Sequence, residues 1–120
     1  MAQYIDGFVI PVPKKSRAKY IRMARLGCKV WMDHGALGYC ESIGDDTPLG
    51  KTTSFPRSVK LKASETVWFS FIVYRSRKHR DRVTARVMKD PRLAQFMNPK
   101  SMPFDGRRMI FGGFKTLVRA

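Results

Sequence analysis

The sequence predicts an α+β fold in which two helices cover one face of a four-stranded antiparallel sheet. Three observations support this class. The expected elements follow the order strand, helix, strand, strand, helix, strand. The strand expected at 67–74 is apolar on both faces, which is unusual in an antiparallel sheet. The chain has 120 residues, of which 43% are hydrophobic, so we expect one domain, residues 1–120, with a single core.

The first strand and the first helix are marked at their ends. Residues 4–12 carry apolar side chains on both faces of the expected strand. Ser16 is a suitable N-cap for a helix that runs to about His34. One stripe of this helix is apolar, and its remaining faces are mainly basic. Gly35 follows at the position where glycine commonly ends a helix.

A second strand and a long connection follow. Residues 37–43 are expected to form the strand, and Asp45 and Asp46 begin a stretch with turn-forming composition. The segment from there to Glu65 is long for a loop without structure of its own. We therefore expect a short additional element near 56–61, although the sequence assigns no role to this segment.

The strand expected at 67–74 indicates that the chain assembles with a second copy. Because side chains alternate along a strand, each of its faces is apolar. One face carries Val67, Phe69, Phe71 and Val73, and the other carries Trp68, Ser70, Ile72 and Tyr74. Two helices can cover only one face of the sheet. We therefore expect a second copy of the chain to cover the other face, which gives a homodimer.

The last third of the chain completes the pattern. Residues 77–89 are expected to form the second helix, and Asp90-Pro91 is expected to start a short helix through Met97. Residues 108–118 read as the last strand, in which Gly112-Gly113 suggests a bulge or a close backbone approach. This order is the split βαβ arrangement (βαββαβ) of ferredoxin-like domains. Two such sheets packed face to face would form a dimeric α/β barrel with the helices outside.

Three motifs resemble the YbaA-like family of uncharacterised bacterial proteins. They are His34-Gly35-Ala36-Leu37 leading to Asp45-Asp46, the run Thr53-Ser54-Phe55-Pro56, and the run from Met102 to Phe114. The resemblance spans nearly the whole chain. It implies the dimeric α/β barrel superfamily, which includes cofactor-free monooxygenases, haem enzymes and plain binding modules. It carries no catalytic residue across, and the fold alone does not choose among these activities.

The net charge of +15 is concentrated in two segments. Residues 14–29 contribute +7 without any acidic residue, and residues 75–92 contribute +6. The densest run contains Arg77, Lys78, Arg80 and Arg82. On a helix, this run could dock nucleic acid or another anionic partner through salt-sensitive phosphate contacts. The alternative is a solvated helix surface that keeps the protein soluble. No recognised nucleic-acid motif accompanies the run.

The candidates for a ligand site are mostly aromatic. They are Trp31, His34, Tyr39, Trp68 and Tyr74. Trp31 shares a helical face with His34, which is the best candidate for a polar group that binds a ligand. The alternative for His34 is a structural role in which its charged form favours the helix C-terminus.

The sequence therefore favours a small-molecule binding protein or a cofactor-free enzyme, with its pocket between the sheet and the helices. The first alternative is a module that binds nucleic acid or another anionic partner through its basic helix faces. The second is a structural or interaction protein without a pocket.

Metal, cofactor and membrane chemistry receive no support from the sequence. The two histidines lack the spacing of metal ligands, and no glycine-rich phosphate loop is present. Glu41, Asp45 and Asp46 form the only acidic cluster, which suits either acid–base work or a turn. Two cysteines without framework spacing, and a start that lacks a secretory signal, indicate a cytoplasmic protein. No apolar run is long enough to span a bilayer.

Overall fold

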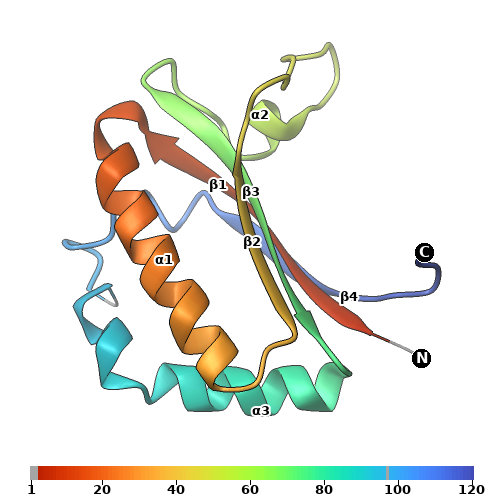
Figure 1. The fold of residues 1–120 in the computed structure, drawn as a ribbon. Helices are drawn as coiled ribbons and strands as arrows, with labels where there is room; N and C mark the ends of the chain where they lie inside the picture. The colour runs from red at the N-terminus through yellow and green to blue at the C-terminus, as the bar shows by residue number, and fades with distance from the viewer. Residues whose placement is uncertain (1–2, 97) are drawn as a thin grey trace.

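A computed structural model describes residues 3–96 and 98–120 of the chain (Figure 1). Its sheet contains four antiparallel strands in the order β2-β3-β1-β4, which confirms the predicted ferredoxin-like fold class. The elements in chain order are β1 (Tyr4–Pro13), the 3-10 turn η1 (Lys14–Ser16), α1 (Arg17–Asp33), β2 (Gly38–Ile43), α2 (Phe55–Ser58), β3 (Glu65–Tyr74), α3 (Arg77–Met88), the 3-10 helix η2 (Pro91–Phe96) and β4 (Ile110–Lys115).

The sheet is organised around its two long central strands. β1 and β3 pair over their full lengths, from Tyr4 opposite Tyr74 to Pro13 opposite Glu65. β2 pairs with the other edge of β3, and β4 pairs with the other edge of β1. Figure 1 shows α1 and α3 on one side of this sheet and α2 on the opposite side. No helix in the described part of the chain is long and apolar enough to cross a membrane.

The side of the sheet that faces α1 and α3 holds the main core. Ile72 and Tyr74 of β3 lie beneath Val30 of α1 and Val83 of α3 in one buried cluster. Trp68, also from β3, packs with residues of β1 and α1 in a second cluster. Burying an apolar side chain of this size stabilises the folded state by about 1.5–3 kcal/mol. The packing on this face therefore holds both helices against the sheet.

The opposite side of the sheet is only partly covered. Val9 and Val67 are buried beneath Val59 and Leu61, which follow α2. The connection between β2 and β3 therefore covers one end of this side of the sheet. The rest, which we call the open face, carries no charged side chain. It consists of the side chains that cross-strand pairing places on this side of the sheet, which are Ile5, Cys40, Phe69, Phe71, Val73, Ile110 and Phe114, together with the exposed Ser42 on the edge strand β2. Phe69 is 45% exposed and Phe114 is 63% exposed.

Most of the predicted helix boundaries are confirmed. Gly35 follows α1 with a positive φ of 107°, a conformation that favours glycine. Asp90 accepts a hydrogen bond from the backbone N–H of Arg92 at 2.9 Å and so caps η2. The short element expected near 56–61 is α2, which begins after Ser54. The expected end of the short helix at Met97 lies outside the described residues.

Three local predictions need correction. The side chain of Ser16 does not cap α1, because the turn η1 runs directly into the helix and a backbone carbonyl serves instead. The Gly112-Gly113 pair forms no bulge, since β4 pairs with β1 in continuous register. The close approach that was the alternative is present at Gly113, where the ring of Tyr4 lies so near that a Cβ would overlap it. At Gly112 a Cβ would make only an ordinary contact with the ring of Phe114, at 3.6 Å. β4 is also shorter than 108–118: it runs from Ile110 to Lys115 and pairs with Tyr4 to Val9 of β1.

A buried ion pair fastens the end of the chain to the loop before β3. Arg108 donates to both carboxylate oxygens of Glu65, with Nη1 2.8 Å from Oε1. The same guanidinium donates to the backbone carbonyl of Lys60 at 3.1 Å. Glu65 also accepts from the backbone N–H of Lys62 at 2.8 Å. The guanidinium holds the pKa of Glu65 below its usual value. These bonds position the turn that leads into β4.

Candidate functional site

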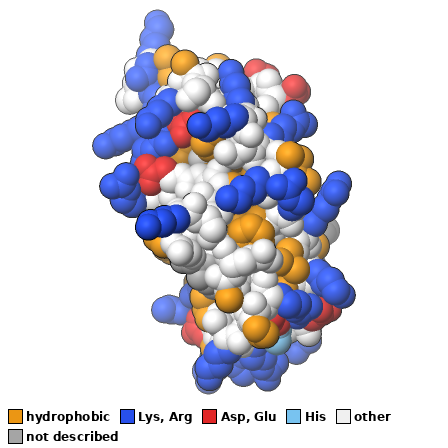
Figure 2. All heavy atoms as spheres, turned by 90° about the vertical axis from the view of Figure 1, so that its left-hand side faces the viewer, with side chains coloured by type: hydrophobic (Ala, Val, Ile, Leu, Met, Phe, Trp, Pro, Cys, Tyr) orange, Lys and Arg blue, Asp and Glu red, His pale blue; other side chains and the backbone are white. Residues whose placement is uncertain are grey.

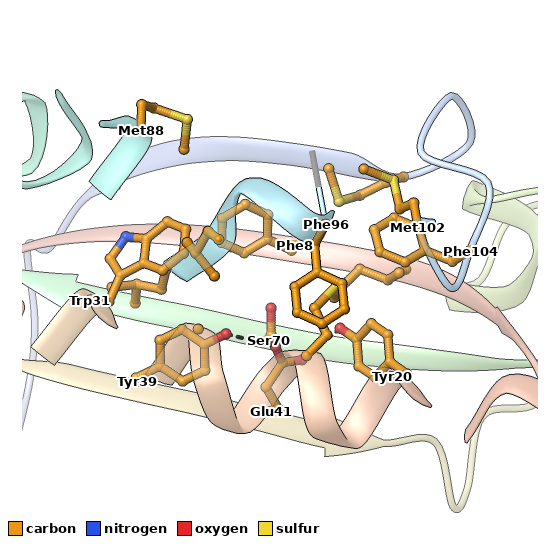
Figure 3. Close-up of a pocket in the computed structure, with 16 residues that line it drawn as sticks. Phe8, Tyr20, Trp31, Tyr39, Glu41, Ser70, Met88, Phe96, Met102 and Phe104 are labelled. Atoms are coloured by element: carbon orange, nitrogen blue, oxygen red, sulfur yellow. Dashed lines mark hydrogen bonds between the residues drawn. The ribbon is translucent and has the colours of Figure 1, made fainter. Parts of the chain in front are cut away.

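A cavity of about 280 Å³ lies between the sheet and the helices (Figure 3). Its floor is formed by side chains of the sheet: Phe8, Ile10, Glu41, Ser70 and Ile72. Tyr20, Met23, Gly27 and Trp31 of α1 line one wall. Leu93 and Phe96 of η2, together with Met102, Phe104 and Met109, line another. The lining is therefore mainly aromatic and methionine side chains, which give an apolar and adaptable surface.

Gly27 explains how the cavity can lie so close to α1. A Cβ atom built at this position would lie 2.9 Å from the hydroxyl oxygen of Tyr39, which is too close for an undisturbed contact. Glycine in the interior of a helix costs about 1 kcal/mol relative to alanine. Here it lets the ring of Tyr39 pass beneath the helix, so a destabilising residue in α1 has a packing reason at the site.

Glu41 is the one charged side chain among the described residues that line the cavity. Its Oε1 accepts a hydrogen bond from the hydroxyl of Tyr20 at 2.8 Å, and its Oε2 accepts one from Tyr39 at 3.0 Å. Burial raises the pKa of Glu41, although the two tyrosine hydrogen bonds oppose this change. Burial, together with the charge of Glu41, also raises the pKa of Tyr20 and of Tyr39. Both phenols therefore stay protonated as donors at neutral pH.

The structure brings Trp31 and Tyr39 together in this cavity. Their ring centroids are 6.1 Å apart, and both rings line its wall. Tyr74 lies behind Trp31 and is fully buried. Its hydroxyl accepts a hydrogen bond from Nε1 of Trp31 at 3.0 Å, which fixes the orientation of the indole. Burial raises the pKa of Tyr74 to about 12, so this residue acts as a neutral support for Trp31.

The other two aromatic-site candidates lie elsewhere. Trp68 is buried against Tyr20, with ring centroids 4.7 Å apart, and does not line the cavity. His34 lies at the C-terminal end of α1, where its Nε2 is 2.8 Å from Oδ2 of Asp90. Asp90 also pairs with Arg92 at 2.7 Å, and these partners hold its pKa below the usual range. His34 therefore joins α1 to η2 and does not line the cavity. The charged side chain that lines it is Glu41.

The basic run on α3 is only partly free. Arg80 donates to Oδ1 of Asp6 at 2.6 Å and to Asp81 at 2.7 Å, so its charge is used within the protein. Arg77, Lys78 and Arg82 are exposed and take part in no ion pair among the described residues. Figure 2 shows Lys and Arg side chains spread over the helix-covered side of the protein, with apolar side chains between them.

Sequence reasoning grouped Glu41 with Asp45 and Asp46, and the structure separates them. The two aspartates are exposed in the bend after β2, as a turn requires. Glu41 lies within β2 and points to the same side of the sheet as Tyr39 (Figure 3). The sequence does contain a signal for this role of Glu41. Tyr39, Glu41 and Ile43 alternate along the strand and share one face, so a carboxylate lies on an otherwise apolar face.

The described residues contain neither a cluster of metal ligands nor a pair of bonded thiols. No three His, Cys, Asp or Glu side chains converge there to hold a metal ion. Cys28 and Cys40 are half-buried free thiols. Cys28 lies on α1 and Cys40 on the open face, so the sheet separates them.

Sequence comparison identifies relatives along almost the whole chain. The model of a family described as "Protein of unknown function (DUF1428)" matches residues 3–106. The uncharacterized protein YbaA of Escherichia coli strain K12 is 41% identical over 116 residues, which cover 97% of each chain. A YbaA protein of Shigella flexneri matches with the same identity and coverage.

Structure comparison supports the fold. A protein from an uncultured marine organism, described as a dimeric ferredoxin-like protein, matches with a TM-score of 0.56 and 12% identity, over 98% of this chain and 96% of its own. A NIPSNAP family protein of unknown function from Agrobacterium tumefaciens matches with a TM-score of 0.53 and 14% identity, over 95% and 86%. At such identities these matches inform on fold alone.

Proposed function

The chain belongs to the DUF1428 family of proteins of unknown function, and within it we propose a homodimeric small-molecule binding protein or cofactor-free enzyme. The single observation that carries this proposal is the cavity between the sheet and the helices. Ligand sites are typically concave and mostly apolar, with a few polar groups that fix orientation. A cavity of about 280 Å³ with one carboxylate at its floor has this character and suits a small ligand.

The proposed dimer forms through the open face. An uncharged apolar surface of this kind marks an interaction site in a folded protein. A second copy offers the same surface, and a twofold axis would pack the two open faces against each other. The marine ferredoxin-like protein, which shares the fold, is described as dimeric. The cavity lies on the other side of the sheet, so this dimer would leave it free for a ligand.

Residues 1–120 would form one ferredoxin-like domain, and the protein would work without a bound cofactor. Its two free thiols suit a reducing, cytoplasmic environment.

Filling the cavity tests the proposed function. Met23 lines the cavity from α1, whereas Met32 lies on the same helix but is 42% exposed. Met23→Trp should weaken binding of N-phenyl-1-naphthylamine, a neutral apolar dye, at least about tenfold, because the indole would occupy the cavity. Fluorescence titration measures the affinity. Met32→Trp is the matched control and should bind the dye like the wild type.

The stability of the filled variant must be checked, because overpacking costs about 1–3 kcal/mol. Circular dichroism and thermal melting establish whether Met23→Trp is folded at the titration temperature. If the folded variant binds the dye as tightly as the wild type, the dye lies outside the cavity and the proposed site is wrong.

A second candidate function is an anionic-partner module, supported by the exposed Arg77, Lys78 and Arg82 and by the net charge of +15. Such contacts would be electrostatic and independent of sequence. Arg80 would contribute little, because Asp6 and Asp81 already neutralise it. The two functions differ in what should accompany the purified protein, namely a small molecule or an oligonucleotide.

A further inference from the structure

The carboxylate of Glu41 lacks the partner that such a group normally has. Glu41 is half-buried, and charged groups that lose contact with water are usually paired with an opposite charge. The chain contains 24 Lys and Arg residues, yet Glu41 takes part in no ion pair among the described residues. Its hydrogen-bond partners are the neutral phenols of Tyr20 and Tyr39. Each carboxylate oxygen keeps a further lone pair for a ligand.

The groups around Glu41 do not supply the missing positive charge within the cavity. Arg25 and Cys28 of α1 border a separate shallow depression on the other side of Glu41, together with Trp68 of β3. Arg25 is exposed. Ser70 of β3 lies beside Glu41 on the cavity floor and carries no charge. The described lining of the cavity contains no Lys or Arg.

The walls next to this carboxylate are aromatic. Figure 3 shows the rings of Phe8, Trp31, Tyr39 and Phe96 around the space above Glu41. The face of an aromatic ring carries negative potential and attracts a cation that lies within about 6 Å of its centre. Aromatic rings of this kind also recognise the apolar substituents of a quaternary ammonium group. The cavity therefore combines one negative charge with several surfaces that favour a soft positive charge.

We propose that the cavity selects a small organic cation with apolar substituents on its nitrogen, and that Glu41 is its counter-ion. This inference rests on the proposed function and names its ligand class. The ammonium centre would lie near the carboxylate, and its substituents would contact the aromatic walls. The two tyrosine hydrogen bonds hold the carboxylate in place, so they are positioning contacts for this pair.

The affinity for such a cation should depend on pH. A permanently charged ligand binds the ionised form of Glu41, and burial raises the pKa of that carboxyl. Affinity should therefore rise as the pH rises through the pKa of Glu41 and then level off. Tyr20 and Tyr39 stay protonated across this range because their pKa values are raised as well. A quaternary ammonium ligand has no titration of its own, so the profile reports on the protein.

Isothermal titration calorimetry with two probes tests this inference. Benzyltrimethylammonium is a quaternary cation, and neopentylbenzene is its neutral isostere with carbon in place of nitrogen. The wild type should bind the cation at least about tenfold more tightly than the isostere. Glu41→Gln keeps the size of the side chain and should lose that preference. Asp46→Asn removes an exposed acid in the bend after β2 and should keep it.

The outcomes separate the ligand class from the existence of the site. If both probes bind equally, or if Glu41→Gln binds the cation like the wild type, the ligand class is wrong and the cavity remains a binding site. If neither probe binds while Met23→Trp still abolishes dye binding, the ligand class is again wrong. If Met23→Trp leaves the affinity for the dye unchanged, the proposed function itself is wrong. Melting temperatures of each variant confirm that it is folded.

Discussion

Phe71→Asp is expected to convert the protein from a dimer into a monomer at micromolar concentration. Phe71 lies at the centre of the open face, where β3 pairs with Gly7 of β1 and Cys40 of β2. A twofold interface would bury two unpaired carboxylates in an apolar surface. A buried charge without a partner typically costs about 3–5 kcal/mol, and each 1.4 kcal/mol is a tenfold change in affinity. The dimer should therefore weaken at least about 100-fold.

Sedimentation velocity over a range of concentrations measures this change. Phe111→Asp is the matched control, because Phe111 is more exposed than Phe71 in the protomer but stacks on Phe8, on the helix side of the sheet. This control should stay dimeric. A Phe71→Asp protein that remains a dimer would show that the open face is not the interface.

Arg108→Leu should lower the free energy of unfolding by about 3 kcal/mol at neutral pH. The side chain of Glu65 is only 4% exposed, and the guanidinium of Arg108 is its one ion-pair partner among the described residues. Without Arg108 the carboxylate keeps only its bond from the backbone N–H of Lys62. The loop before β3 would also lose the bond from Arg108 to the carbonyl of Lys60.

Chemical denaturation with urea measures this loss, and its pH dependence checks the cause. The pKa of Glu65 is lowered in the folded wild type, so its stabilisation is present above the usual value of 4.5 and is lost as the pH falls. The difference between wild type and variant should therefore shrink in acid. Arg107→Leu is the control: Arg107 is 93% exposed and should change stability by less than about 0.5 kcal/mol. A constant difference from neutral to acidic pH would argue against the ion pair as the cause.

The fold could be predicted from sequence because its signals are local. Alternation along residues 67–74 indicated a strand with two apolar faces, and those faces are the helix-side core and the open face. Gly35 and Asp90 marked helix ends through backbone rules that depend on neighbouring residues alone. Ser16 failed because a 3-10 turn precedes α1, and the pattern of the helix itself gives no sign of that turn.

The candidate site was harder to predict because its contacts join distant segments. Trp31 and Tyr39 line the cavity, and both were candidates for a ligand site on their chemistry. His34 and Asp90 are 56 residues apart in sequence, so their pairing was not readable. Glu41 had a local signal in the alternation of β2, but its two tyrosine partners become clear only when α1 lies over the sheet.

Native mass spectrometry of the freshly purified protein tests both the dimer and the cavity in one measurement. We expect a dimer that carries a defined non-covalent adduct of small mass, and the Met23→Trp dimer should lack it. A monomer would contradict the role of the open face. A dimer that carries an oligonucleotide and no small molecule would contradict the cavity as the functional site and would favour the exposed Lys and Arg side chains of α3 instead.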